Sequence, residues 1–406
     1  MNIVDRWENA DLARSVPQAP IVVPSLTGIR FVAAMMVLLG HGCPLLQFGD
    51  FLIPSQILGP LAPIGMTVFF VLSGFIMWLN YAPSFRQDLG SAIWGFGVAR
   101  FARLYPMYAC VLVLAAITTP WDSFVAAFPN AFAYLGLIQA WVPTNGSTVM
   151  TLSIWSLGHT WSISVEMFLY AIFPAICFGL FRFKSRATFV MLATLMALML
   201  GIAIYFSLFN IPPIAAWFTP LSVGDAYQWI AYHSPFTHVF EFAAGCCAGA
   251  AYGGRKLEGG SWIAYLASAG LIASVTLFIF LSDTGAWYQV SVSAVRVLPV
   301  LAVCSLLFSL ASTDTIIRRF LSSRLMVVGG EVSYSAYLLH GFIYVLFVHP
   351  SVEHVSLLGF LGWLAILSGA IATVIVFSYG TYSLIEVPAR RWLRQHLSPS
   401  PGIGSR

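Results

Sequence analysis

Long, almost uninterrupted apolar stretches dominate the pattern of hydrophobic and polar positions along the chain. A helix needs about 20 mostly apolar residues to cross a bilayer. Ten segments of about that length follow one another: 26–46, 61–80, 100–118, 161–181, 187–209, 236–253, 262–282, 290–311, 332–349 and 356–381. No internal repeat and no long linker separates them. The pattern therefore predicts an all-α fold, a polytopic membrane helix bundle with about ten spanning helices in one membrane domain.

The composition fits lipid as the solvent of this bundle. Hydrophobic residues make up 59% of the 406 residues and charged residues only 8%. Soluble domains carry about 25% charged residues. Water solvates a surface this poor in charge badly, so the sequence predicts no soluble domain of any size.

Neither nucleic acid nor a metal ion is expected as a partner. The Lys and Arg residues form no basic run interleaved with polar aromatic residues, as a nucleic-acid-binding face would need. The six cysteines lie inside apolar segments, without a Cys-x-x-Cys pair or a Cys/His cluster of zinc-ligand spacing. We interpret them as small buried hydrophobic residues.

Charge between the apolar segments predicts the orientation, because cytoplasmic loops are enriched in Lys and Arg. Counted alternately from a cytoplasmic N-terminus, one set of connections holds the basic residues Arg6, Arg14, Arg86, Arg182, Lys184, Arg186, Arg255, Lys256, Arg318, Arg319, Arg324, Arg390, Arg391, Arg394 and Arg406. The other set holds Asp50, Asp122, Asp225, Asp283 and Glu353, with no Lys or Arg. Both termini are therefore predicted to be cytoplasmic, as tails 1–25 and 391–406 on either side of a membrane domain 26–390.

An eleventh apolar segment, 124–142, is broken by Pro129, Asn130 and Gln139. If it crossed the bilayer, the basic loop 182–186 would lie outside. We therefore predict that this segment is re-entrant or interfacial. Irregular backbone at membrane depth must be covered by protein or face water, so the outer connection 119–160 is expected to form part of a binding cavity.

Ionisable residues at membrane depth are the first candidates for a site, because a central charge costs about 2.5–3.5 kcal/mol on insertion scales. These residues are Arg30, His41, Glu166, Glu241, Arg296, His340 and Glu386, with Arg100 and Arg103 at the inner edge of the third span. Three of them lie close enough to helix ends that snorkelling to the interface is an alternative: Arg30, Glu241 and Glu386.

Four of these residues can converge. Arg30 and His41 are eleven residues apart, which places them on one helix face about 16 Å apart along the axis. Glu166 and His340 are predicted to reach a depth similar to that of His41. A carboxylate beside an imidazole fixes its tautomer and stabilises its protonated form, which suits a general base.

Each candidate also has a structural interpretation. A lone histidine in a membrane can simply hydrogen-bond between helices, and this applies to His41 and His340; Arg296 also has a structural alternative. The two arginines at the inner edge of the third span also satisfy the rule that cytoplasmic ends are basic. Ser73 could be a nucleophile, but it lacks a Gly-x-Ser-x-Gly frame, and close helix packing explains its Ser-Gly pair.

Six short strings occur in a fixed order: Leu26–Phe31 with Gly40–Gly42, Phe69–Phe75, Arg100–Pro106, His159–Glu166, Ser333–His340 and Ile385–Pro388. With these strings on ten spans, the chain resembles the bacterial membrane acyltransferases of family 3, which O-acylate carbohydrates. The resemblance covers nearly the whole chain, from about Leu26 to Arg390.

The resemblance implies transfer of an acyl group, acetyl by family precedent, from cytoplasmic acyl-CoA to a hydroxyl of a sugar-containing acceptor. Acyl-CoA would be a co-substrate, and no permanently bound cofactor is expected. The acceptor could be an exopolysaccharide, a lipopolysaccharide, a glycolipid unit or a small glycoside, and the protein would lie in the bacterial inner membrane. The acceptor, an acyl group other than acetyl, such as succinyl or a longer one, and the oligomeric state stay open.

The resemblance also implies roles for residues. His41 would be the catalytic base and Arg30 its essential companion, while Arg100 and Arg103 would contact the phosphates of the donor. Glu166 is expected to orient His41, and a covalent acyl-histidine intermediate is an alternative mechanism. The remaining candidate site residues are Ser73, His159, Trp161, Arg296 and His340.

Longer members of the family carry a further esterase-like domain after the last span. Here about 20 residues follow Glu386, so acceptor handling is expected from the membrane domain or from another protein. A secondary transporter or flippase is the alternative function, but such folds usually show two related halves, and no repeat is seen. A membrane scaffold would not need Arg30 and His41 on one face.

Overall fold

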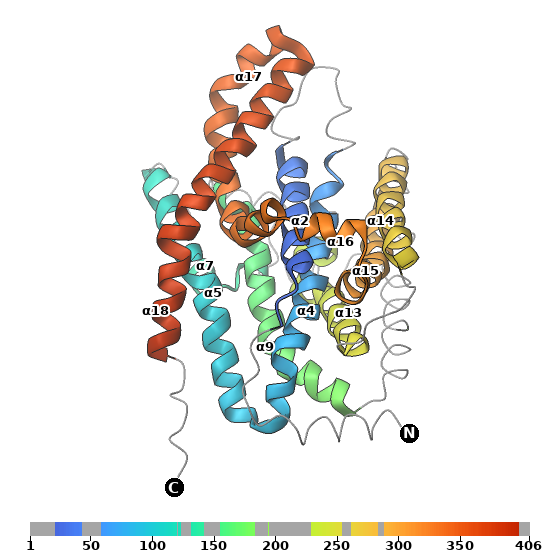
Figure 1. Cartoon of the computed structure of the whole chain (residues 1–406). Helices are drawn as coiled ribbons and strands as arrows, with labels where there is room; N and C mark the ends of the chain where they lie inside the picture. Colours follow the sequence, from blue (N-terminus) through green and yellow to red (C-terminus); the bar gives the residue numbers. More distant parts are fainter. Residues whose placement is uncertain are drawn as a thin grey trace, which may run out of the picture.

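The computed structural model describes residues 21–42, 58–119, 121–122, 131–141, 155–182, 194, 229–253, 261–282 and 288–397. Within these ranges every regular element is a helix and there is no strand. Figure 1 shows the helices gathered into one bundle. The predicted all-α class is therefore confirmed for the described part of the chain.

Eight helices are long: α2 (Pro24–Gly42), α4 (Leu61–Gln87), α5 (Leu89–Thr118), α9 (Trp161–Arg182), α13 (Pro235–Tyr252), α14 (Ser261–Ser282), α15 (Tyr288–Ser312) and α17 (Arg324–Thr381). The shorter elements are α7 (Ala131–Leu135), α16 (Ile316–Leu321), α18 (Val387–Leu397), the 3₁₀ helices η2 (Gln139–Trp141) and η3 (Trp155–Thr160), and the π-helices η4 (Trp229–His233) and η6 (Tyr382–Glu386).

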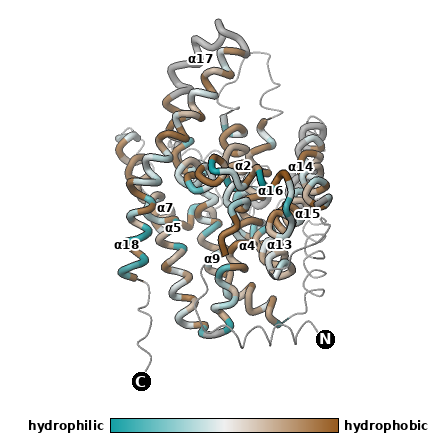
Figure 2. Tube along the Cα trace, viewed as in Figure 1, coloured by the Kyte–Doolittle hydropathy of each residue, from teal (hydrophilic) through white to brown (hydrophobic). Residues whose placement is uncertain are grey.

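Five of the described helical segments are long and apolar enough to cross a membrane: Pro24–Gly42, Leu61–Arg86, Leu89–Thr118, Leu157–Arg182 and Leu361–Leu397. Apolar residues extend along these helices (Figure 2), and some are largely exposed, such as Ile117 at 76%. Lipid can solvate such surfaces, so the chain is an integral membrane protein. The count of ten spans and the cytoplasmic termini stay predictions, and span 187–209 lies outside the described residues except for residue 194.

Helix α17 folds back on itself. Tyr344 and Leu367 both lie within 4 Å of the point that a Cβ atom on Gly42 would occupy. A straight helix would place residues 23 positions apart about 35 Å from each other. The two arms of α17 run side by side at the upper end of Figure 1, and they contain the predicted spans 332–349 and 356–381.

Glycines allow α4 and α13 to pack closely. A Cβ atom on Gly74 would lie 2.0 Å from the carbonyl oxygen of Phe242, and one on Gly245 would lie 1.9 Å from that of Val71. No side chain fits into such a contact, so the two backbones can approach only at glycine. The glycine of the Ser73-Gly74 pair therefore has a packing role.

The described part of segment 124–142 is not a continuous helix. Helix α7 ends at Leu135, Leu137 has a left-handed φ of 56°, and η2 follows. The Nε2 atom of Gln139 donates a hydrogen bond to the carbonyl oxygen of Thr160, 3.0 Å away, which ties the segment to the start of α9. Its re-entrant or interfacial position in the bilayer stays a prediction.

Candidate functional site

A cavity lies between α2, α4, α5, α9 and α17, with about 710 Å³ of empty volume that includes its open mouth. It is lined by five residues that the sequence singles out: Arg30, Ser73, Arg100, Arg103 and Glu166. Helix α2 contributes Arg30, α4 contributes Ser73 and α5 contributes both Arg100 and Arg103, while Glu166 comes from α9. The fold thus brings together candidates that are up to 136 positions apart in the sequence.

Arg100 is held by aromatic side chains and keeps unused hydrogen-bonding capacity. Its Nη2 atom donates to the hydroxyl of Tyr81 at 2.6 Å, and its guanidinium lies 4.9 Å from the centre of that ring. Its Nε atom is buried and has no hydrogen-bond partner among the described residues. A buried donor without a partner costs free energy. Because the Arg100 side chain lines the cavity and its contacts are with aromatic residues, its guanidinium group is suited to bind an anion that enters there.

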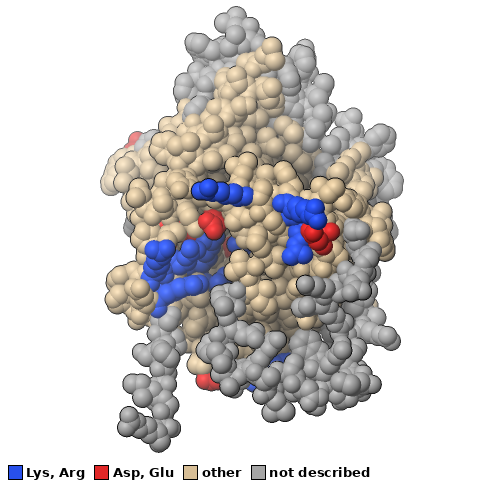
Figure 3. All heavy atoms as spheres, in the orientation of Figure 1, with Lys and Arg blue, Asp and Glu red and all other residues tan. Residues whose placement is uncertain are grey.

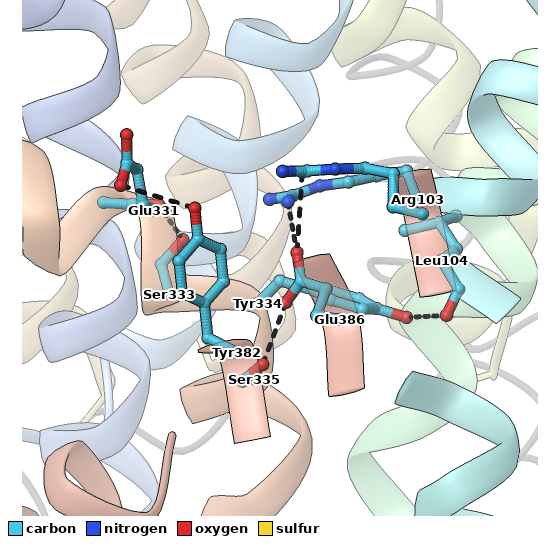
Figure 4. Close-up of polar contacts among 10 residues, drawn as sticks. Arg103, Leu104, Glu331, Ser333, Tyr334, Ser335, Tyr382 and Glu386 are labelled. Carbon is cyan, nitrogen blue, oxygen red and sulfur yellow. Dashed lines mark hydrogen bonds and ion pairs between the residues drawn. The ribbon is translucent and has the colours of Figure 1, made fainter. Parts of the chain in front are cut away.

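Arg103 is oriented by a carboxylate from η6, the π-helix that follows α17. It forms an ion pair with Glu386, whose other oxygen accepts a hydrogen bond from the Ser335 hydroxyl at 2.9 Å (Figure 4). Glu386 is only 1% exposed, so it does not snorkel to the interface. Tyr334 adds a cation–π contact, with its ring centre 5.7 Å from the guanidinium carbon of Arg103.

Positive charge exceeds negative charge in the cavity. Arg30 interacts electrostatically with Arg100, Arg103 and Glu166. Glu166 is also bound by the Tyr170 hydroxyl. Three guanidinium groups and one carboxylate therefore line the same space, an arrangement that attracts an anionic ligand.

His41 belongs to a second cluster, made of three histidines. Its Nδ1 atom lies 2.9 Å from the Nε2 atom of His340, and the two rings are almost parallel, 7° apart. The ring of His159 lies 4.4 Å from that of His340, measured between centres. The cluster therefore joins α2, η3 and the first arm of α17.

Backbone carbonyls of α17 fix the tautomers of this cluster. The Nδ1 atom of His340 must donate to the carbonyl oxygen of Tyr337, 2.5 Å away, because a carbonyl can only accept. In a neutral ring the Nε2 atom of His340 is then an acceptor, so His41 donates from Nδ1. The tautomer of His41 that is assigned from these hydrogen bonds carries its proton on Nδ1. Its Nε2 atom therefore keeps a lone pair, which a general base requires.

Tyr337 connects the cavity with the histidines. Its side chain lines the cavity, while its hydroxyl donates to the carbonyl oxygen of His159 and lies close to the Ser162 hydroxyl, at 2.6 Å in each case. His41 does not line the cavity, so the Tyr337 side chain and its hydrogen bonds lie between the arginines and the base.

The structure changes one predicted contact. Glu166 was expected to orient His41, but its hydrogen-bond partner is Tyr170, one helical turn further along α9. The group that orients His41 is His340. The reason is depth: Glu166 lies in the arginine cavity with Arg30, whereas His41 lies three turns away at the opposite end of α2.

Glu241 is part of a buried pair outside this cavity. Its carboxylate accepts from the Thr67 hydroxyl at 2.8 Å and lies 2.7 Å from the Nδ1 atom of His238. The ring of Trp161 stacks on His238 at 5.3 Å. Trp161 and Glu241 are therefore held in the packing between α4, α9 and α13, and Glu241 does not snorkel.

Of the remaining candidate site residues, the structure places Ser73 in the cavity but does not describe the side chain of Arg296. Ser73 lines the cavity and donates to the Tyr170 hydroxyl at 3.4 Å. Arg296 belongs to α15, but its side chain lies outside the described residues. The cavity tyrosines were not singled out, although Tyr170 follows Glu166 by four positions and Tyr337 precedes His340 by three, spacings that place each pair on one helix face.

Comparisons with known proteins identify relatives. The chain is 30% identical over 174 residues to the acyltransferase MdmB of Streptomyces mycarofaciens, a match covering 39% of this chain and 40% of that protein. It is 23% identical over 393 residues to the O-acetyltransferase OatA of Staphylococcus aureus (strain NCTC 8325 / PS 47), covering 92% of this chain and 58% of that protein. The matches thus span less than two thirds of either relative. No solved structure matches the chain significantly.

The match to a family model is more extensive. The model of the acyltransferase domain matches residues 23–381. This range contains the arginine cavity and all three histidines of the second cluster. Because the match extends over nearly the whole chain, the chain belongs to the acyltransferase domain family, and the resemblance to the membrane acyltransferases is confirmed.

Proposed function

We propose that the protein transfers an acetyl group from acyl-CoA to a hydroxyl of a carbohydrate acceptor in the bacterial inner membrane. The observation that carries this proposal is a cavity lined by three arginines and, on the far side of Tyr337, a histidine with a ring nitrogen free to act as a base. The relative OatA is named an O-acetyltransferase and the relative MdmB an acyltransferase, which supports the reaction type.

The lining of the cavity suits an acyl-CoA donor. Phosphate oxygens would bind at Arg100 and Arg103, where charge-assisted hydrogen bonds are strong. Beyond these arginines the wall is largely apolar, with Met66, Phe69 and Phe70, and can accept the long arm that separates the phosphates from the thioester. The acyl group would then lie toward Tyr337 and the histidines.

His41 acts as the general base in the proposed reaction. Its Nε2 atom takes the proton of the acceptor hydroxyl while that oxygen attacks the thioester carbonyl carbon. The carbon–sulfur bond breaks, and the thiolate that leaves takes up a proton from the His41 imidazolium. His340 keeps His41 in the tautomer that presents Nε2.

The two substrates approach from opposite sides in this proposal. The loops that we predict to be cytoplasmic carry the basic residues, so the donor enters from the cytoplasm beside Arg100. The acceptor approaches from the outer side, where the end of α2 places His41. The protein would move an acyl group across the membrane without moving its donor.

The substitution His41→Ala tests this function in purified protein reconstituted in lipid. Because general bases contribute about 10²–10⁴-fold to a rate, acceptor-dependent consumption of acetyl-CoA should fall by at least about 100-fold. The control is Arg319→Gln, an exposed residue paired with Asp314 away from the cavity, which should keep the wild-type rate. Transfer at the wild-type rate by a folded, membrane-inserted His41→Ala protein would remove the assignment.

A further inference from the structure

Helix α18 carries two arginines beside the cavity. None of its side chains is buried, and its residues pack along α5. The indole nitrogen of Trp94 donates to the carbonyl oxygen of Leu397 at 3.0 Å, which fixes the end of α18 against α5. Arg390 and Arg394 are one turn apart and about 40° apart around this helix, whereas Arg391 is turned about 100° away from Arg390 and about 60° from Arg394.

These two arginines continue the row of positive charge that begins in the cavity. The Nη1 atom of Arg390 lies 3.8 Å from the Oε1 atom of Glu386, the same atom that Arg103 binds. Arg394 interacts electrostatically with Arg103, Arg100 and Arg390. Figure 3 shows Lys and Arg side chains gathered on the left of the molecule, where α18 and α5 lie in Figure 1.

The row is not neutral. Its five guanidinium groups are those of Arg30, Arg100, Arg103, Arg390 and Arg394, and two of the described carboxylates beside it are those of Glu166 and Glu386. A third is that of Glu331, which accepts a hydrogen bond at 3.4 Å from Tyr382, a side chain that also interacts with Arg390 and Arg103. Among the described residues, five positive charges thus face three negative ones, which leaves an excess of two positive charges. Like charges repel strongly near a low-dielectric membrane, so this row is built to be neutralised by a ligand with several negative charges.

We propose that Arg390 and Arg394 form a second anion subsite at the mouth of the cavity, which binds a phosphate of the donor remote from the thioester. The proposal rests on the proposed acyl-CoA donor. Such a donor carries a diphosphate and, separately, a phosphate on its ribose. Arg100 and Arg103, which line the cavity, bind the diphosphate, and the α18 pair outside the cavity binds the ribose phosphate.

A phosphate on α18 could also come from an anionic lipid headgroup, since basic residues next to a membrane attract such lipids. The two sources differ in one respect. A subsite for the donor discriminates between donors with and without the ribose phosphate, in any lipid. A lipid site depends on the membrane composition and ignores this phosphate of the donor.

The test compares Arg394→Gln with Arg391→Gln, two substitutions that remove the same charge from neighbouring turns of α18. Binding of acetyl-CoA and of 3′-dephospho-acetyl-CoA is measured on the full chain in nanodiscs of phosphatidylcholine, and again with phosphatidylglycerol added. Arg394→Gln should weaken acetyl-CoA binding about tenfold, as loss of one charge-assisted contact does, and leave binding of the dephospho compound within about twofold. Arg391→Gln should change neither.

Three results would overturn the subsite: equal effects of the two substitutions, an equal loss for both donors, or an effect of Arg394→Gln that appears only with phosphatidylglycerol. The last result would assign α18 to lipid headgroups. A folded wild-type protein that binds neither compound would overturn the proposed donor, and the subsite with it. This failure is distinguishable because it appears without any substitution.

Discussion

At the scale of single residues, the two cavity arginines of α5 are kept in place by different partners. Arg100 rests on the ring and hydroxyl of Tyr81, whereas Arg103 is paired with Glu386. An aromatic partner leaves the guanidinium charge in place, and a carboxylate neutralises it. Arg100 is therefore the arginine with more capacity for a phosphate, and its unpaired Nε atom points to the same conclusion.

His340 is a positioning residue at this scale. Its replacement by Ala removes the acceptor for the Nδ1 hydrogen of His41, so His41 loses its fixed tautomer. We expect His340→Ala to lower kcat about 100-fold with little change in the KM for the donor, because the arginine cavity is untouched. His340→Gln, whose amide oxygen can replace the lost acceptor, should recover part of kcat.

Steady-state kinetics with the reconstituted protein measure both constants. A purely structural role would lower kcat equally in the two variants or raise the KM for the donor. Either outcome would remove His340 from the proposed mechanism.

The sequence predicts the types of residue in the site better than their contacts. The spacing of Arg30 and His41 places them about three turns apart on α2, and in the structure Arg30 lines the cavity while His41 lies in the last turn of the helix. It does not reveal that Glu166 binds Tyr170 while His41 binds His340, because the sequence alone does not place Glu166 at the level of Arg30 rather than at that of His41. The tyrosines lack a charge and so stay hidden among the 16 tyrosines of the chain.

At the scale of elements, close backbone contacts hold the walls of the cavity together. Gly245 of α13 packs directly against the carbonyl oxygen of Val71 in α4, and α4 carries the cavity residues Phe69, Phe70 and Ser73. Hydrophobicity alone predicts α4 and α13 as separate spans. It does not predict that glycines bring them into contact, because that depends on which helix faces are paired.

The same substitution at two glycines tests this contact. Gly245→Ala should destabilise the protein by about 1–3 kcal/mol, because its Cβ would lie 1.9 Å from the Val71 carbonyl oxygen and force the helices apart. Gly179→Ala in α9 meets nothing within 4 Å and should be neutral or slightly stabilising, since Ala favours helix over Gly by about 1 kcal/mol. Thermal unfolding in detergent gives both values. Equal melting temperatures for the two variants would show that α4 and α13 are not packed in this way.

The path of α17 is a second case in which the sequence is only partly informative. Two apolar stretches separated by a few polar residues predict two spans. The structure keeps helical backbone through the connection and folds the element back, so that Glu386 returns to the level of Ser335 and Arg103. A pattern of apolar residues gives the length of each arm but not the partner to which the second arm returns.

At the scale of the whole molecule, the bundle separates two kinds of chemistry. The cavity arginines come from α2 and α5, and α5 packs against α18. The histidines lie where the last turn of α2 meets η3 and the first arm of α17. Tyr337 stands between them. Low charge content and long apolar helices predict the membrane bundle, but the separation follows from contacts between helices that are distant in the sequence.

The arginine cavity is the proposed binding site for the phosphates of an acyl donor. Binding of acetyl-CoA to Arg100→Gln, measured by calorimetry on reconstituted protein with Arg319→Gln as the exposed control, tests it most directly. Charge-assisted hydrogen bonds contribute about 1.5–3 kcal/mol, so Arg100→Gln should lose about 10- to 100-fold in affinity and the control should keep the wild-type affinity. Unchanged affinity of a folded Arg100→Gln protein would show that the cavity does not bind the phosphates of the donor in this way.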